Sequence, residues 1–147
     1  MGHSLASVHV HFVFSTKKRL PYLKGELQAD MFAYLGGIVR EVGGKAVIVG
    51  GMPDHVHLLV RMPTGTSISD FMRVVKANSS KWVKARQRHF AWQTGFAAFS
   101  VSMPVLPEVT RYIQEQEKHH RKMTFQQELV ALLKKHNIGY DERYIWS

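Results

Sequence analysis

Cysteine is absent from the 147-residue sequence. Its absence excludes disulfide bonds, thiolate catalysis and zinc sites built on cysteine. No apolar run approaches the roughly 18 residues that span a membrane, and the N-terminal segment has no basic stretch followed by a long apolar one. We therefore expect a soluble, cytoplasmic protein that makes no membrane contact.

Acidic residues are few: 11 Asp and Glu stand against 20 Lys and Arg, which gives a formal net charge of +9. A positive field of this size favours polyanions, nucleic acid above all, and makes their binding depend on salt. Hydrophobic residues make up 45% of the chain and charged residues 21%, close to the averages of globular proteins. Length and composition together predict one domain, residues 1–147.

Two hydrophobic periods alternate along the chain. Apolar residues two apart predict strands, and apolar residues three and four apart predict amphipathic helices. Ser67 is an expected N-cap, and Thr124 with Gln127 forms a capping-box pattern. Strands are expected at residues 7–16, 45–50, 55–62 and 95–101, and helices at 26–41, 67–88, 107–120 and after Thr124. This β-α-β-β-α-β order predicts an α+β, ferredoxin-like antiparallel sheet with helices on one face, an added C-terminal helix, and the other face free for a ligand or partner subunit.

A pair of histidines, His55 and His57, lies on the third predicted strand. Residues i and i+2 of a strand project from the same face, so the two imidazoles can share one cation. The alternative is that they form the polar face of a half-buried strand. We assign no site to His9 and His11, which show that the same spacing can occur without one.

Tyr112 and Gln116 are four residues apart on a predicted helix, so they point the same way. A tyrosine hydroxyl can act as a nucleophile and form a covalent intermediate, and Gln116 offers a neutral oxygen ligand. The alternative is that Tyr112 packs in the core and Gln116 is solvated.

The strand signature P-D-H-V-H-L-L-V and the helix signature V-x-x-Y-I-x-x-Q-x-x-H-H resemble the single-tyrosine HUH transposases of bacterial insertion sequences. These are the IS200-like transposases, whose relatives are the REP-associated tyrosine transposases. The segments F-V-F-S-T-K-K-R, W-Q-x-G-F-x-A-F-S-V-S and Y-D-E-R-Y-I-W are similar to family features as well. The resemblance covers nearly the whole chain. The prolines at 104 and 107, before the tyrosine helix, are a local departure.

The resemblance implies a single-strand DNA endonuclease-ligase used in excision and insertion. Tyr112 would be the catalytic nucleophile, giving a 5′-phosphotyrosine and a free 3′-OH, and His55, His57 and Gln116 would bind the metal. Two nitrogens and an amide oxygen suit Mn²⁺, with Mg²⁺ the expected cellular ion. The family also implies single-stranded or hairpin DNA as partner, and a homodimer whose sites are completed in trans.

Basic residues are the expected contacts to the DNA backbone. Each of them has a solvated surface as its alternative role. A non-catalytic, ferredoxin-like RNA- or DNA-binding module would also explain the charge and the element order, but not the histidine pair or Tyr112. A different histidine-dependent phosphoesterase is the third possibility. The candidate DNA-binding residues are Lys17, Lys18, Arg19, Lys76, Lys81, Lys84 and Arg121.

Overall fold

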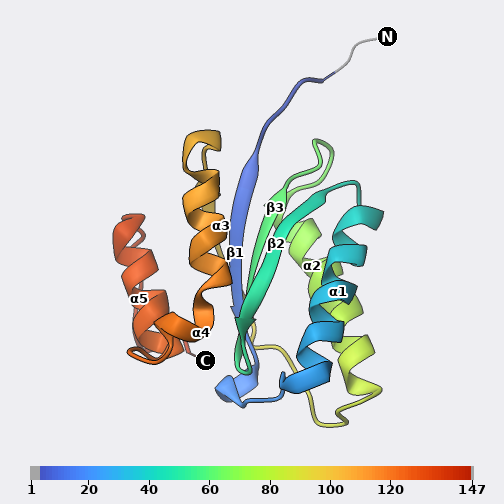
Figure 1. Ribbon diagram of the computed structural model, residues 1–147, viewed down its shortest axis with the longest axis vertical. Coiled ribbons are helices and arrows are strands. Elements are labelled where there is room, and N and C mark those ends of the chain that lie inside the picture. Colours follow the sequence, from blue (N-terminus) through green and yellow to red (C-terminus); the bar gives the residue numbers. More distant parts are fainter. Residues whose placement is uncertain (1–3, 147) are drawn as a thin grey trace.

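A four-stranded antiparallel sheet with the strand order β2-β3-β1-β4 forms the centre of the computed structural model, which describes residues 4–146 (Figure 1). This is the ferredoxin-like order, and it confirms the α+β fold expected from the sequence. The strands are β1 (His9–Ser15), β2 (Lys45–Met52), β3 (His55–Arg61) and β4 (Ala97–Val101). The helices are α1 (Gly25–Glu41), α2 (Ile68–Lys84), α3 (Leu106–Gln114), α4 (Gln116–His119) and α5 (Phe125–Lys135), with short 3-10 turns η1 (Lys17–Arg19) and η2 (Met103–Val105).

The helix starts follow the local sequence. The Ser67 side chain accepts a hydrogen bond from the Asp70 backbone N–H, as expected of an N-cap. Thr124 and Gln127 form both hydrogen bonds of a capping box at the start of α5. The predicted continuous helix over 107–120 is wrong in one respect: it is interrupted at Glu115, which has φ −95° and ψ 21°. Gln116 therefore lies on a separate short helix, α4, and not on the helix that carries Tyr112.

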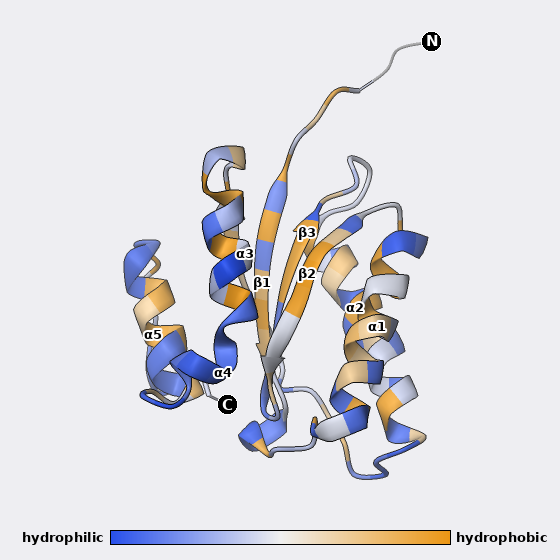
Figure 2. Cartoon of the chain, in the orientation of Figure 1, coloured by the Kyte–Doolittle hydropathy of each residue, from blue (hydrophilic) through white to orange (hydrophobic). Residues whose placement is uncertain are grey.

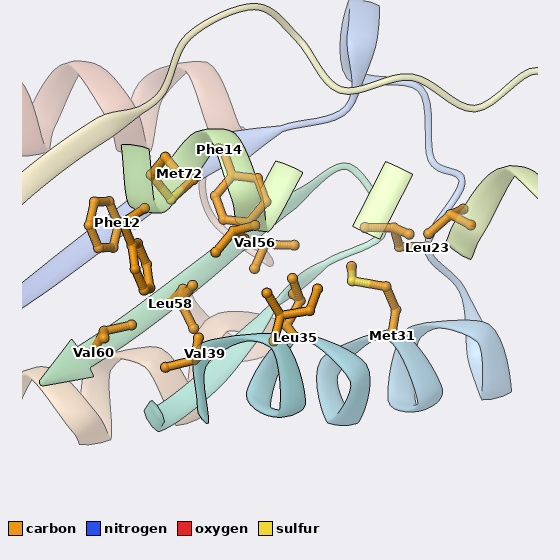
Figure 3. Close-up of a cluster of buried hydrophobic side chains, with 14 of the residues drawn as sticks. Phe12, Phe14, Leu23, Met31, Leu35, Val39, Val56, Leu58, Val60 and Met72 are labelled. Atoms are coloured by element: carbon orange, nitrogen blue, oxygen red, sulfur yellow. The ribbon is translucent and has the colours of Figure 1, made fainter. Parts of the chain in front are cut away.

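One face of the sheet packs on α1 and α2 and forms the main hydrophobic core. Alternate residues of β1 and β3, such as Phe12, Phe14, Val56 and Leu58, point into this core (Figure 3). Figure 2 shows the alternation as hydrophilic and hydrophobic bands along β1. The period-two pattern read from the sequence is thus confirmed, and it leaves the intervening histidines on the opposite face.

The opposite face is covered, so the prediction of a free face is wrong. Helices α3, α4 and α5 lie over it, on the side of the sheet away from α1 and α2 (Figure 1). Ile113 of α3 packs against Leu59 of β3, and Phe125 of α5 belongs to a second apolar cluster with Phe99 of β4. The apolar stripes of α3 and α5 provide this cover, because each must be buried against another element.

None of the helices in residues 4–146 combines the length and apolar character that crossing a membrane requires.

Candidate active site and metal centre

The two histidines of β3 are completely buried beneath α3–α5. His55 and His57 each have 0% of their surface exposed. Strand β3 lies in the middle of the sheet, between β2 and β1, so its backbone is hydrogen-bonded on both sides. Both imidazoles project from the same face, as the strand period requires, and they are held on a strand that is paired along both edges.

Helix α3 brings Tyr112 to the same place by packing closely on β2. Gly50 of β2 pairs with His57 of β3. A Cβ atom at Gly50 would lie 2.7 Å from Ile113 Cγ2 and 2.8 Å from the Ile113 carbonyl oxygen. Only a residue without a side chain permits this approach, and Tyr112 is the residue next to Ile113. The closeness of α3 to the sheet therefore fixes the position of the phenol.

Glu128, on α5, is the centre of the cluster. Its Oε1 atom lies 3.2 Å from His55 Nε2, 3.1 Å from His57 Nε2 and 2.9 Å from His120 Nε2. Its Oε2 atom accepts hydrogen bonds from the Tyr112 hydroxyl and, at 2.8 Å, from Gln116 Nε2. The carboxylate thus links the imidazoles directly to the phenol.

Gln116 completes the inner set. Its Oε1 atom lies 2.9 Å from His55 Nε2 and 3.1 Å from His120 Nε2. Only 2% of its surface is exposed. The structure therefore brings together the four residues that the sequence singled out, Tyr112, His55, His57 and Gln116, within one chain.

Outer contacts hold the two imidazoles with Nε2 turned inward. His55 Nδ1 lies 2.7 Å from Asp54 Oδ1, and its ring stacks on Phe125 with ring centroids 4.5 Å apart. His57 Nδ1 lies 2.7 Å from Nε2 of His11 on β1. Such partners fix the tautomer and orientation of a metal-binding histidine. His11 therefore belongs to the site, although we assigned it no role from the sequence.

The charges of the cluster are unevenly shared. Burial alone lowers the pKa of His55, but hydrogen bonds with Asp54 and Glu128 outweigh it and raise that pKa to about 9. Burial raises the pKa of Glu128, but hydrogen bonds from His55 and His57 hold it well below its usual range. Glu128 is therefore a carboxylate paired with a protonated His55.

Three groups, His57, His11 and Tyr112, are held neutral. Burial, the largest cause, lowers the pKa of His57, and burial together with the nearby His57 lowers the pKa of His11 to about 3. Burial and the negative charge of Glu128 raise the pKa of Tyr112. The phenol thus keeps its proton in this state, and it needs a positive charge nearby to lose it.

The donor set fits a divalent cation. One ligand atom each from His55, His57 and Glu128 lie within 4.8 Å of one another, and all three residues are buried. Imidazole nitrogens with a carboxylate oxygen are common ligands of divalent ions. Gln116 Oε1, beside His55 Nε2, offers a fourth donor. Buried, convergent donors of this kind could hold a divalent metal.

The family profile described as "Transposase IS200 like" matches residues 4–116, more than half of the chain. The chain belongs to the IS200-like transposase family. It is therefore a DNA transposase, as the resemblance implied. The matched region contains the histidine pair, Tyr112 and Gln116, and it ends before Glu128.

Individual relatives agree with this placement. The transposase is 25% identical over 114 residues to the ISDra2 transposase TnpA of Deinococcus radiodurans, covering 72% of this chain and 81% of that protein. Two solved structures share its fold. One, from Deinococcus radiodurans R1 and assigned as a transposase, has a TM-score of 0.65 and 24% identity, covering 79% of this chain and 96% of the other. The second is a REP-associated tyrosine transposase bound to a REP hairpin, with a TM-score of 0.62, 17% identity and coverage of 82% and 72%.

The predicted DNA-binding residues of the transposase fall into two groups. Lys18 and Arg19 line a pocket of about 530 Å³ together with Asp54 and His120, so the η1 turn adjoins the cluster. Lys17 belongs to that turn, and Arg121 directly follows His120. The other three, on α2, lie on the opposite side of the sheet. For all seven residues, contact with DNA remains a prediction.

The ammonium group of Lys76 is already engaged by the backbone of the same chain. It donates to the backbone carbonyls of Gln93 and Gly95 at 2.6 and 2.7 Å. Burial lowers its pKa. These bonds tie the segment before β4 to α2, which is a structural role. The exposed Lys81 and Lys84 of the same helix remain available to a phosphate backbone.

The sequence does not assign Glu128, His11 or His120 to the metal-binding cluster, although His120 is part of the helix signature. Glu128 lies three residues after Phe125 and four before Leu132, on the apolar stripe of α5. A carboxylate on a stripe that is otherwise apolar signals a buried partner, because Glu is almost never buried unpaired. His11 had the same spacing pattern as the site pair, but its contact with His57 depends on which strands are neighbours.

Proposed function

We propose that the transposase cuts and rejoins single-stranded DNA by attack of Tyr112 on a phosphodiester. The observation that carries the proposal is the bond from the Tyr112 hydroxyl to Glu128, whose carboxylate also meets Nε2 of His55 and His57. Phosphoryl transfer requires a nucleophile next to a site of positive charge. The hydrogen bond to Glu128 holds the Tyr112 hydroxyl beside side chains that could bind a cation.

The step exchanges one ester for another. The Tyr112 oxygen forms a bond to phosphorus while the bond from phosphorus to the 3′-oxygen breaks. The phenol proton passes to Glu128, its present hydrogen-bond acceptor, and from there to solvent, which balances the proton that the departing 3′-oxygen takes from water. The products are a 5′-phosphotyrosine and a 3′-hydroxyl. Because the phosphodiester energy is kept in the new ester, a 3′-hydroxyl can reverse the step and join strands without ATP.

His55, His57 and Gln116 are the proposed metal-binding residues, and the geometry adds Glu128 to them. When bound, Mg²⁺ or Mn²⁺ supplies a Lewis acid and orients a phosphate oxygen. The protein's own part is to exclude water from this pocket and to keep both imidazoles turned inward through Asp54 and His11.

Tyr112 is proposed to act in cis, on the site of its own chain. What supports this is the contact of Ile113 with Gly50 of the same chain and the short link to α3. Only residues 102–105 separate β4 from α3, and four residues span at most about 14 Å. Pro104 in this link and Pro107 in α3 further restrict the backbone. The homodimer with sites completed in trans remains the competing prediction.

The DNA substrate is proposed to be a hairpin with a single-stranded flank. The structural neighbour bound to a REP hairpin supports this choice, as does the net charge of +9. The η1 turn, residues 17–19, is the proposed contact for the backbone near the cut, because Lys18 and Arg19 line the pocket that His120 also lines.

The test uses a 5′-labelled and a 3′-labelled hairpin DNA with single-stranded flanks, incubated with Mg²⁺ or Mn²⁺. We expect a covalent protein–DNA adduct on denaturing gels that carries the 3′ label only. Tyr112→Phe should abolish the adduct, and His57→Ala should abolish its metal-dependent formation, while both variants keep DNA affinity. Binding without an adduct would identify a nucleic-acid-binding module, and cleavage without an adduct would identify a hydrolase.

Mixing two inactive variants distinguishes cis from trans. Tyr112→Phe keeps the histidines, and His57→Ala keeps the tyrosine. If the site is completed in trans, mixed dimers regain adduct formation on one subunit. Action in cis predicts no recovery at any ratio, and mass measurement shows whether the 16.8 kDa chain forms a dimer at all.

A further inference from the structure

A cavity of about 250 Å³ adjoins Tyr112 and is distinct from the metal-binding cluster. It lies between β4, α3 and α5, and its lining includes His11, Phe99, Val109, Tyr112 and Leu132. Among the described residues that line it, none is His55, His57, Gln116 or Glu128. Tyr112 and His11 therefore form the wall that separates the cavity from the cluster.

The walls of the cavity suit a flat aromatic ligand. Phe99 and His136 form a ring pair with centroids 4.4 Å apart, and the His11 ring lies 5.9 Å from Phe99. Val109 and Leu132 supply aliphatic surface. Polar groups of Glu108 and Lys135 stand among the lining residues, both exposed to solvent. An apolar slot with a polar rim is how proteins bind an unstacked nucleobase.

The volume limits the ligand to one small ring system. Pockets for drug-sized ligands span about 300–1,000 Å³, and this cavity is smaller. The position of the cavity beside Tyr112 indicates that this ring system is a nucleobase close to the cut. A phosphodiester attacked by Tyr112 must lie against the Tyr112 hydroxyl, and the base of a flanking nucleotide is only one sugar away from that phosphate. The base can therefore enter the cavity while the phosphate stays beside the cluster.

We propose that this cavity binds the base of a nucleotide next to the cut, and so selects the cleavage position. The proposal rests on the proposed function, since it assumes that Tyr112 attacks DNA. Stacking of the base against the rings that line the cavity would provide most of the binding, and such stacking tolerates different bases. Glu108 and Lys135 at the rim would distinguish bases by their exocyclic amino and carbonyl groups.

The first experiment replaces single nucleotides around the cut by abasic sites and measures adduct formation. We expect about a tenfold loss at one flanking position and little effect at the others, because one stacked base is removed. Val105→Trp, at a position that lines the cavity and is 40% exposed, should place its ring in the opening. This variant should lose the same factor on intact DNA and show no further loss on the abasic strand.

Val8→Trp is the matched control, because Val8 is 53% exposed and does not line the cavity. It should behave like the unmodified protein. If all abasic positions are equally tolerated, or if Val105→Trp and Val8→Trp behave alike while both remain folded by circular dichroism, the cavity does not bind a base.

A second readout does not require cleavage. The Tyr112→Phe variant is titrated with a series of strands, each of which carries 2-aminopurine at a different position. Stacking in the cavity should quench the fluorescence of 2-aminopurine at one position only. Adding Val105→Trp should remove that quenching. Position-specific quenching with no adduct in the unmodified protein would refute nicking but retain the base site. Adducts without position-specific quenching would retain nicking and refute the base site.

Discussion

Replacing Gly50 by alanine should move Tyr112, the proposed nucleophile, away from the histidine pair without displacing the histidines. The added Cβ would lie 2.7 Å from Ile113 Cγ2 and 2.8 Å from the Ile113 carbonyl oxygen. A side chain can rotate away from the first contact. The second is with backbone, so α3 must move, and Tyr112 moves with it.

The size of the effect follows from the cost of overpacking. Forcing extra atoms into a packed contact costs about 1–3 kcal/mol. If that cost falls on the docked position of α3, adduct formation slows about ten- to a hundredfold, since each 1.36 kcal/mol is a factor of ten. His55 and His57 lie on β3 and keep their partners Asp54 and His11, so metal affinity should fall much less than the rate of adduct formation.

The assay measures the rate of adduct formation and, separately, metal affinity by titration calorimetry. Gly36→Ala is the matched control: it lies in α1, on the other side of the sheet, and a Cβ there meets nothing within 4 Å. This change should be neutral or stabilise α1 by about 0.5–1 kcal/mol. An unchanged adduct rate in Gly50→Ala would refute the positioning argument. Equal loss of adduct and metal binding would show that the substitution disrupts the sheet instead.

Three further predictions concern the cluster. Glu128→Gln keeps the shape but removes the charge, so metal affinity should fall at least about tenfold, and an unchanged titration would exclude Glu128 as a ligand. His11→Phe removes the partner of His57 Nδ1 and should weaken metal binding about 10- to 100-fold while leaving DNA affinity intact. The pKa of His55 is raised from 6.5 to about 9. Its protonation therefore adds about 3 kcal/mol to the free energy of unfolding. This stabilisation is fully present below pH 6.5 and is lost as the pH rises through about 9. Urea denaturation of the metal-free protein should show this loss, and His55→Gln should flatten it.

The sheet and its inward-facing residues could be predicted because they depend on local patterns. Alternation in β1 and β3 determines which side chains share a face, and the caps at Ser67 and Thr124 are local hydrogen bonds. The cover over the second face could not be predicted in the same way. The apolar stripes of α3 and α5 show that each helix must be buried, but the stripes do not specify against which surface.

In the candidate site, too, some features follow from local sequence patterns and others depend on long-range packing. His55 and His57 share a face because they are neighbours on one strand, whereas Glu128 reaches them from a helix 71 residues beyond His57. Such a contact depends on long-range packing that no local spacing reveals. Two residues could still have raised suspicion: Glu128 on the apolar stripe of α5, and Gly50 in the middle of a strand, where glycine often marks a close backbone approach.

The residues of the cluster come from the sheet and from three different helices. His55 and His57 come from the sheet, Gln116 from α4 and Glu128 from α5, and the phenol of α3 is bonded to that same carboxylate. A ligand bound by all of these donors stabilises the state in which they are together, because it binds the folded arrangement and not the separated one. Metal binding and docking of Tyr112 are therefore coupled. The transposase should hold Tyr112, the proposed nucleophile, most firmly when the proposed cation is present.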